Sequence, residues 1–315
     1  MVTFEPLVSI VIPVYNGGNV LAQAIDSALA QTYHNIEVLV IDDGSNDGGK
    51  TQAVVHTYGN RIRYYRKENG GVASALNMGI RHMHGEYFSW LSHDDLYLPG
   101  KVAHQVRLLS CCGDPKRIVA GGYVITDENI KLIAVMDFHA LYGKEKLETP
   151  LFPVFHCAVN GCTLLIHRSH FECVGLFDES LPTTQDYELW FRMMRGQRIL
   201  YTPRFDVISR EHSGQTSRRM KAEHEAECTR LWLRLFGELT DTEMALMGGT
   251  KERFYADMYD HFSKYTSYTE VAEWLKEKAK ESGGQYQFGG RRQSCFRILF
   301  EKVRLRLLLR NLALN

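Results

Sequence analysis

Hydrophobic residues follow two alternating patterns along the first part of the chain. Apolar runs occur at residues 8–14, 36–41 and 87–91, and the first two are rich in β-branched residues. Runs that are apolar on both faces predict strands of a buried, mostly parallel sheet. Between these runs, as at residues 21–29, apolar side chains recur at helical spacing. Strands that alternate with helices at short intervals predict a doubly wound α/β fold of Rossmann-like type, with right-handed crossovers.

The pattern changes after a predicted helix at residues 99–109. Residues 131–150 show no clear period, and we expect a flexible or acceptor-facing segment there. Apolar stripes at helical spacing between about residues 220 and 280 predict packed helices. The remaining expected elements are strands at 62–66, 118–125, 161–166 and 198–201, and helices at 71–80, 169–174 and 185–194.

Length and composition are those of an ordinary globular protein. A chain of 315 residues can hold one large domain and an appendage. The 37 basic and 37 acidic residues cancel, so no overall charge favours nucleic acid as a partner. We expect an α/β domain at residues 1–217, a helical C-terminal extension at 218–282, and a glycine-rich linker with a tail at 283–315.

The cysteines and the apolar segments predict the compartment. The seven cysteines are odd in number and form no C-x-x-C pair, which favours a reducing, cytoplasmic environment. The first residues carry no basic region and no long apolar run, so we expect no signal peptide. No uninterrupted apolar stretch approaches the ~18–20 residues that a membrane span needs.

The last segment of the sequence, which runs from Arg291 to Asn315, is basic. It interleaves apolar residues with arginines and lysines, and Glu301 is its only acid. A strongly basic amphipathic helix is typical of a segment that lies on an anionic membrane surface. The alternative is a terminal helix that docks on the protein body or on a second subunit, which leaves a homo-oligomer open.

Acidic pairs stand at three predicted strand or helix ends: Asp42 and Asp43, Asp94 and Asp95, and Asp186 and Glu188. The first two pairs follow parallel strands, so they share one sheet edge, where such folds bind ligands. Asp94 and Asp95 repel each other and favour a hard divalent cation, which would in turn hold phosphate oxygens. Alternatively, these two residues cap a helix that starts near Pro99. Asp186 suits a general base.

The motifs around these acids resemble those of glycosyltransferase family 2. The matching stretches are VSIVIPVYN at 8–16, ALAQT at 28–32, EVLVIDDGS at 37–45, NGGVASALNMG at 69–79 and GEYFSWLSHDD at 85–95. FDE at 177–179 and QDYELW at 185–190 resemble the acceptor-side motif of the family. The resemblance covers about residues 6 to 215. It implies a GT-A fold, a nucleotide-diphosphate sugar donor, preferably a UDP-sugar, and inversion at the anomeric carbon.

The resemblance also implies roles for individual residues. Pro13 and Tyr15 line the nucleotide pocket, Asp43 contacts the base with Asp42 beside it, Asn69 and Asp94 belong to the nucleotide-sugar site, Asp95 and His212 bind Mn²⁺ or Mg²⁺, and Asp186 deprotonates the acceptor hydroxyl. One departure is His93, which precedes the acidic pair where the family usually has a small residue or an aspartate. We interpret His93 as a loop residue.

The sequence therefore predicts a metal-dependent inverting glycosyltransferase of the hexosyltransferase class, peripheral on the inner face of the cell membrane. Its expected acceptor is a saccharide or a saccharide linked to polyprenyl diphosphate, used in surface polysaccharide (O-antigen or capsule) biosynthesis. One alternative is a nucleotidyltransferase, but the loop after the first strand lacks its basic residue. The other is a non-catalytic, membrane-bound partner, against which the intact acids at all three sites argue.

Overall fold

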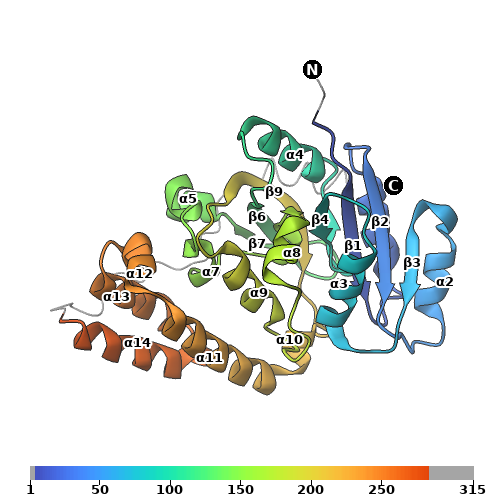
Figure 1. The fold of residues 1–315 in the computed structure, drawn as a ribbon. Coiled ribbons are helices and arrows are strands. Elements are labelled where there is room, and N and C mark those ends of the chain that lie inside the picture. Colours follow the sequence, from blue (N-terminus) through green and yellow to red (C-terminus); the bar gives the residue numbers. More distant parts are fainter. Residues whose placement is uncertain (1–3, 284–315) are drawn as a thin grey trace.

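The computed structural model describes residues 4–283, and Figure 1 shows its α/β part beside a group of C-terminal helices. Residues 284–315 carry the predicted basic tail and nearly all of the predicted linker, so those predictions lie outside the described residues. Among the described helices, none is both long and apolar enough to cross a membrane.

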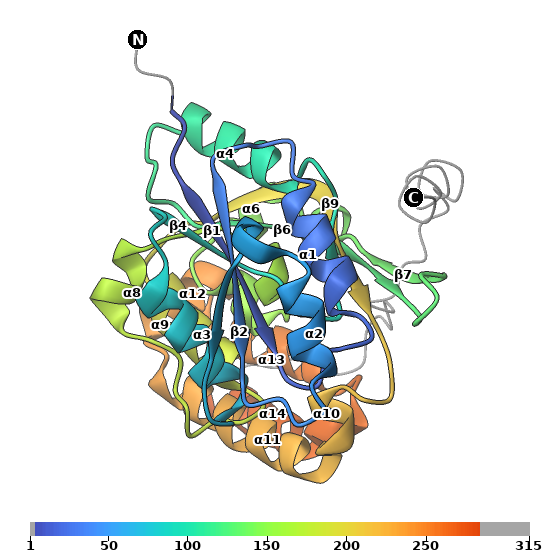
Figure 2. The ribbon, with the colours of Figure 1, turned by 90° about the vertical axis from the view of Figure 1, so that its right-hand side faces the viewer.

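The main sheet has the strand order β3-β2-β1-β4-β8. Its first four strands are parallel, and β8 closes the edge antiparallel to β4. Figure 2 shows α1 and α2 on one face of this sheet and α3 on the other, which confirms the predicted doubly wound, mostly parallel architecture. The bounds are β1 Val8–Val14, β2 Ile36–Asp42, β3 Arg63–Arg66, β4 Tyr87–Trp90, β8 Ile166–His167, α1 Leu21–Leu29, α2 Lys50–His56 with a 3₁₀ turn at Gly59–Arg61, and α3 Gly71–His82.

The centre of this sheet packs tightly against α3. All seven residues of β1 are buried, as its apolar pattern requires. Gly79 of α3 lies directly on the Val11 side chain of β1, and a Cβ at Gly79 would overlap the methyl groups of Val11. The glycine therefore sets the distance between helix and sheet.

Replacing Gly79 with alanine should destabilise the fold by roughly 1–2 kcal/mol. Overpacking a core costs about 1–3 kcal/mol, and the better helix propensity of alanine returns at most about 1 kcal/mol. Urea unfolding measures the change. Gly237→Ala is the matched control, because Gly237 also lies in a helix but a Cβ there would meet nothing within 4 Å. The control should be neutral or slightly stabilising, and equal losses in both variants would contradict this account.

A second, four-stranded sheet has the order β5-β9-β6-β7. Its strands β6 and β9 are parallel, whereas the β5–β9 and β6–β7 pairs are antiparallel. The elements around it are β5 Leu96–Tyr97, α4 Lys101–Cys111, β6 Val119–Thr126, β7 Leu132–Met136, α5 Phe138–Tyr142, α6 Lys144–Leu147, α7 Phe152–Phe155, a 3₁₀ turn at Gly161–Thr163, α8 Ser169–Val174, α9 Gln185–Met194 and β9 Leu200–Arg210.

The structure differs from three sequence predictions in this second half. Residues 131–150 are not an irregular segment, because β7 forms a hairpin with β6 and two short helices follow. The strand expected at 161–166 is mostly a 3₁₀ turn, in which the Asn160 side chain accepts a hydrogen bond from the N–H of Cys162 at 2.9 Å. The late strand expected at 198–201 extends to Arg210, because pairing with β6 continues along it.

The C-terminal helices share one continuous buried core with the α/β part. Aromatic rings join the two, and Phe155 of α7 contacts Trp232, Phe236 and Phe254 with ring centroids 5.0 to 6.0 Å apart. The predicted division between residues 217 and 218 stays a prediction. The helices are α10 Thr216–Arg219, α11 Lys221–Glu238, α12 Asp241–Gly248, α13 Lys251–Phe262 and α14 Thr269–Glu281, with a 3₁₀ turn at Thr266–Tyr268.

Candidate active site

The carboxylate of Asp43 lies just beyond the C-terminal end of β2. It accepts hydrogen bonds from Lys67 Nζ at 2.7 Å and from the N–H groups of Gly70 and Gly71 at 3.0 and 2.7 Å, where α3 begins. A carboxylate offers about four acceptor positions, so one remains for a further N–H donor such as a nucleotide base. Asn69 supports the same turn, because its side-chain amide donates to the Asp43 carbonyl at 2.9 Å.

Asp42 is almost fully buried, and its hydrogen-bond partners belong to the following loop and to β3. Its oxygens accept from the N–H of Ser45 at 2.8 Å and from the hydroxyl of Tyr64 at 2.7 Å, and Arg66 Nε lies 3.6 Å away. The side chain therefore supports the loop that presents Asp43, which agrees with its expected place beside that residue.

The loop after β1 forms the opposite wall of this edge. Tyr15 is 37% exposed and its hydroxyl reaches Asn46 at 3.4 Å, so its ring is available to a ligand. Pro13 is buried within β1, and His93 makes a hydrogen bond to its backbone. The ring of His93 packs against Gly17, where a Cβ would lie 2.8 Å from His93 Cδ2. His93 thus joins the loop of the acidic pair to the end of β1.

The adjacent acids Asp94 and Asp95 have different surroundings. Asp95 is 6% exposed, and its oxygens accept from the Arg210 N–H at 2.9 Å and from Cys162 Sγ at 3.6 Å. Burial, and next the charge of Asp94, raise the pKa of Asp95 above the usual range of a carboxyl. Asp94 is partly exposed, and its Oδ2 lies 2.7 Å from His212 Nε2.

The alternative interpretation of this acidic pair as a helix cap is wrong. Helix α4 starts at Lys101, its N-cap residue is Gly100, and no side chain caps it. The first residue of α4, Lys101, is itself buried. Lys101 Nζ lies 4.1 Å from the centroid of the Tyr97 ring and 3.2 Å from the Leu164 carbonyl oxygen, and burial lowers the pKa of this lysine to about 7.

Arg210, at the end of β9, supplies a cation that the sequence reasoning missed. Its guanidinium donates to the Asp94 carbonyl and to Gln23 Oε1 at 2.6 Å, while its Nη2 atom is buried and has no partner among the described residues. The positive charge compensates part of the repulsion between Asp94 and Asp95. Its one signal in the sequence is its place two residues before His212, in the stretch REHSGQTS at 210–217.

The residues around Asp94 fit a divalent cation. Asp94 and His212 offer one carboxylate and one imidazole on the accessible side of the loop, and a bound cation would replace their hydrogen bond. Ions of this kind take oxygen ligands and keep several from water and substrate phosphates. Within residues 4–283, no group of three or more His, Cys, Asp or Glu side chains could hold a metal by itself, so a diphosphate would have to complete the site. Asp95 fits less well, because both of its oxygens are already engaged inside the protein.

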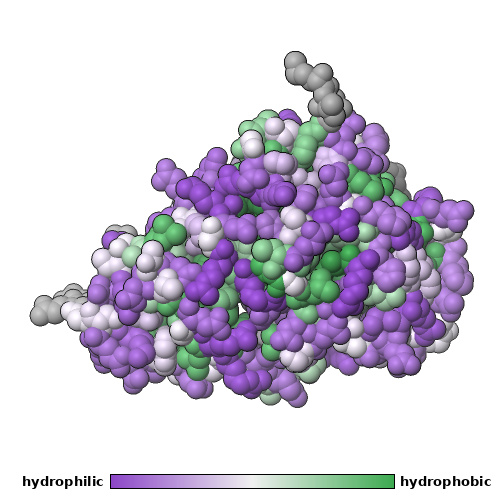
Figure 3. All heavy atoms as spheres, in the orientation of Figure 1, coloured by the Kyte–Doolittle hydropathy of each residue, from purple (hydrophilic) through white to green (hydrophobic). Residues whose placement is uncertain are grey.

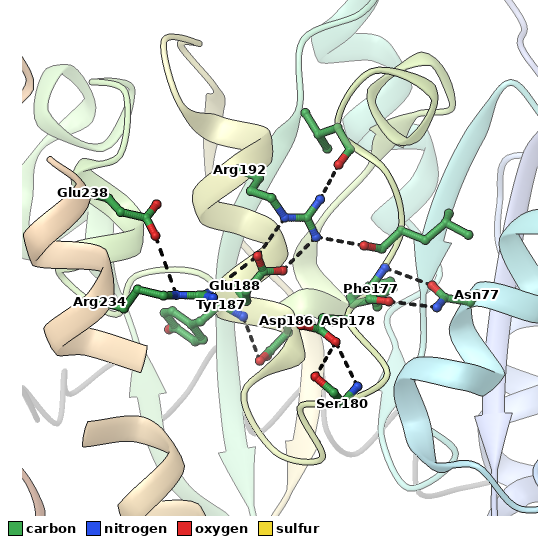
Figure 4. A network of polar contacts seen from close by, with 12 residues as sticks. Asn77, Phe177, Asp178, Ser180, Asp186, Tyr187, Glu188, Arg192, Arg234 and Glu238 are labelled. Atoms are coloured by element: carbon green, nitrogen blue, oxygen red, sulfur yellow. Dashed lines mark hydrogen bonds and ion pairs between the residues drawn. The ribbon is translucent and has the colours of Figure 1, made fainter. Parts of the chain in front are cut away.

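Asp186 is the second residue of α9 and is held by a network that Figure 4 shows. Arg192 of α9 makes a bidentate ion pair with Glu188 at 2.7 and 2.8 Å and donates to the Leu176 carbonyl at 2.8 Å. Asn77 of α3 donates to the Phe177 carbonyl at 2.9 Å and accepts from its N–H at 3.0 Å. The segment that leads to Asp186 is therefore bound to both α9 and α3.

The segment just before α9 is held from the C-terminal helices. A single oxygen of Glu227, on α11, accepts from the N–H groups of Thr183 and Thr184 at 3.0 and 2.8 Å and from the Thr184 hydroxyl at 2.6 Å. Burial raises the pKa of Asp186 to about 6, the hydrogen bond from the Tyr187 N–H opposes this rise, and Glu227 adds to it. A carboxylate with this pKa is suited to accept a proton near neutral pH.

A cavity of about 440 Å³ opens beside Asp186. Its walls come from β6, β7, α5 and α9 on one side and from α11, α13 and the 3₁₀ turn at Thr266–Tyr268 on the other. Seen from the side of Figure 1, the outer surface is mostly hydrophilic, and hydrophobic side chains show mainly near its middle (Figure 3). Only the QDYELW motif at 185–190 points to this cavity in the sequence, since the rest of the lining comes from segments far apart in the chain.

The structure therefore groups the predicted residues around two places. Asp42, Asp43, Asn69 and Tyr15 lie at the C-terminal ends of β1 and β2, and the Asp94–His212 contact lies beyond β4. Asp186 lies on α9, at the cavity. The functional assignment of each residue stays a prediction.

Comparison with known families and sequences gives consistent matches. The model of the family described as Glycosyl transferase family 2 matches residues 9–175. An uncharacterized glycosyltransferase of Rickettsia bellii (strain RML369-C) is 46% identical over 279 residues, which are 89% of this chain and 40% of that protein. Another, of Rickettsia typhi (strain Wilmington), is 46% identical over 262 residues, 83% of this chain and 81% of that protein. This chain thus spans less than half of the length of the first relative.

Two solved structures share the fold at low sequence identity. TarS of S. aureus, residues 1–349, in complex with UDP-GlcNAc aligns with a TM-score of 0.59 and 13% identity over 87% of this chain and 88% of that one. The mannosyltransferase PcManGT of Pyrobaculum calidifontis, in complex with GDP-Man and Mn²⁺, aligns with a TM-score of 0.59 and 18% identity over 90% of this chain and 77% of that one.

Proposed function

Because this chain belongs to glycosyl transferase family 2 and has the GT-A fold of its structural neighbours, we propose that it is a sugar transferase. The sugar moves from a nucleotide-diphosphate sugar to an acceptor hydroxyl with inversion at the anomeric carbon. The observation that carries the proposal is the placement of Asp186. An acid whose pKa is raised to about 6 lies at a cavity large enough for a small molecule, on a segment fixed by hydrogen bonds.

The proposed reaction needs one base and no covalent sugar–enzyme intermediate. Asp186 takes the proton from the acceptor hydroxyl while that oxygen forms a bond to the anomeric carbon. The bond from the anomeric carbon to the diphosphate oxygen breaks on the opposite face, and the nucleoside diphosphate leaves with the electron pair. Arg210 lies beside the loop that carries Asp94 and Asp95. Its positive charge there offsets the repulsion of the leaving diphosphate by these two acids.

We assign the donor to the edge formed by β1, β2 and β4. Asp43 keeps one acceptor position for the base, Tyr15 is exposed for stacking, and Asp42 and Asn69 support the loop. Pro13, which is buried in β1, would form the base of this donor site. The bound nucleotides of the structural neighbours, UDP-GlcNAc and GDP-Man, support a nucleotide-sugar donor, and we favour a UDP-sugar.

For the cofactor we propose Mn²⁺ or Mg²⁺, held by Asp94 and His212. When bound, the cation would supply charge stabilisation for the leaving diphosphate. We place Asp94 in the role that the motif comparison gave to Asp95, because Asp94 is the accessible member of the pair and already faces His212. Asp95 would then hold the loop to β9 through the Arg210 N–H.

The acceptor and the place of action rest on the sequence. We propose a saccharide acceptor, linked to polyprenyl diphosphate and used in surface polysaccharide synthesis, with the protein peripheral on the inner face of the membrane. The basic segment 291–315, which lies outside the described residues, would contact the anionic lipids. Flotation with anionic liposomes, before and after deletion of this segment, tests the contact, and unchanged flotation would refute it.

The proposed function is tested by donor binding and hydrolysis across a panel of UDP-, GDP- and TDP-sugars. Each is measured by calorimetry and by release of the nucleoside diphosphate, with Mn²⁺, with Mg²⁺ and with chelator. We expect one nucleotide sugar to bind in a metal-dependent way and to be slowly hydrolysed. If no member binds under any of these conditions, the proposal fails and a non-catalytic role replaces it.

A further inference from the structure

The cavity beside Asp186 is enclosed by two parts of the chain that are distant in sequence. The second sheet and α5 contribute residues such as Tyr123 and Phe138, whereas α11 and α13 contribute Trp232 and His261. In Figure 1, α11 and α13 lie next to α7 and α9. The volume of about 440 Å³ is within the ~300–1,000 Å³ range that is typical of small-molecule sites.

The lining of the cavity is aromatic and nearly free of charge. Tyrosine and tryptophan rings form much of the wall, and such rings offer flat apolar faces for the C–H groups of a sugar. Among the described residues that line the cavity, Asp186 is the single Asp, Glu, Lys or Arg.

The three histidines of the lining do not add positive charge. Burial lowers the pKa of His156 to about 3 and that of His261 to about 4, and it also lowers the pKa of His224. All three imidazoles are therefore neutral near pH 7. An anionic group in the cavity would meet the Asp186 carboxylate with no cation of the lining to compensate it.

Two of the lining residues each carry a buried polar atom that has no partner within the described part of the chain. These atoms are the Nε2 atom of His261, a residue that is 5% exposed, and the hydroxyl oxygen of Thr183. Buried polar atoms are nearly always hydrogen-bonded. Where a rotation of the side chain turns such an atom toward the cavity, a ligand hydroxyl, which both donates and accepts, can satisfy it.

We propose that this cavity is the acceptor subsite and that it takes an uncharged sugar ring, while any phosphate or carboxylate of the acceptor stays outside. The inference rests on the proposed function and adds the chemical class of the group that receives the sugar. It also places acceptor recognition partly on α11 and α13, outside the region that the family model matches.

The test uses the full chain, the donor selected by the nucleotide-sugar panel, and matched acceptors. The neutral acceptors are the 4-nitrophenyl glycosides of glucose, galactose and N-acetylglucosamine. The charged acceptors are the glucuronide, the galacturonide and the 6-phosphates of the neutral set. Transfer and calorimetric binding are both measured, so that binding is detected even without turnover. We expect at least one neutral glycoside to be preferred over its charged counterpart by about 100-fold or more, because like charges would be brought together.

A conservative variant tests the contribution of the wall. Thr183→Val keeps the shape of the side chain and the backbone contact with Glu227 but removes the hydroxyl. Loss of one hydrogen bond should raise the KM for the neutral acceptor about 3- to 10-fold and leave donor hydrolysis unchanged. Thr229→Val is the matched control, because Thr229 lies on α11, bonds the Glu225 carbonyl and does not line the cavity.

The outcomes separate this inference from the function on which it rests. A donor that binds and is hydrolysed, together with equal or better use of the charged acceptors, overturns the inference and leaves the proposed function intact. The same holds if no neutral glycoside of the panel binds, or if Thr183→Val and Thr229→Val behave alike. If no donor binds at all, the proposed function itself fails.

Discussion

Replacing Asp186 with asparagine should lower the rate of sugar transfer by roughly 10²- to 10⁴-fold, the usual contribution of a positioned general base. The amide has the size of the carboxylate but does not accept the proton of the acceptor hydroxyl. Donor affinity should stay within about twofold, because Asp186 lies on α9 and the donor residues lie at the ends of β1, β2 and β4. Steady-state transfer and calorimetric donor binding measure the two effects separately.

The pH profile identifies the base. Because burial raises the pKa of Asp186 to about 6, the carboxyl is protonated and inactive below that pH and becomes active as pH rises through it. The wild-type kcat/KM should therefore fall about tenfold for each pH unit below about 6 and level off above it. The residual activity of Asp186→Asn should lack this step.

Asp260→Asn is the matched control for Asp186→Asn. Asp260 is also a partly buried acid whose pKa is raised by burial, but it lies on α13 and does not line the cavity. This variant should keep both the rate and the pH step. Transfer by Asp186→Asn at a rate close to that of the wild type would remove Asp186 from the mechanism.

Replacing Asp94 with asparagine should reduce metal-dependent transfer about 100-fold or more, because an interaction worth several kcal/mol with the leaving diphosphate is lost. The binding gain that Mn²⁺ or Mg²⁺ gives to the donor should disappear, so that affinity equals that of the wild type in chelator. Donor titrations with and without each metal measure this loss directly.

The neighbouring substitution, Asp95→Ala, should lower the free energy of unfolding instead. Asp95 is buried and accepts from the Arg210 N–H and from Cys162, so removal of its oxygens leaves a buried N–H without a partner and should cost about 1–3 kcal/mol. Its folded fraction should keep the metal response. If Asp95→Ala loses the metal response and Asp94→Asn keeps it, the original assignment of the metal to Asp95 holds and the exchanged roles are wrong.

The donor half of the fold could be predicted because its signals are local. The strand at Val8–Val14 and the helix at Leu21–Leu29 have the bounds that the apolar pattern gave, and the order of strands and helices fixed the doubly wound topology. Buried parallel strands are apolar on both faces, so a short window of sequence identifies them. Acids that directly follow such strands lie at the carboxyl edge of the sheet, so the position of Asp43 could be predicted as well.

The acceptor half was harder to predict because its structure depends on partners distant in sequence. Strand β7 is recognisable only once β6 is known to pair with it, and Ile133 on β7 is 48% exposed, so the alternation is weak. The anchoring of the Thr183–Thr184 backbone to Glu227 joins residues more than forty positions apart. No window of the sequence shows that a glutamate on an amphipathic helix is buried and accepts three hydrogen bonds.

The contact of Glu227 has a consequence for the order of events during synthesis. The ribosome makes the donor site, up to His212, before it makes α11, so the nascent chain can complete its nucleotide-binding edge while the segment that carries Asp186 still lacks its anchor. Domains that emerge first generally fold first. A nascent chain would thus acquire donor recognition before transfer competence, because α11 and the later α13 both contribute to the cavity beside Asp186.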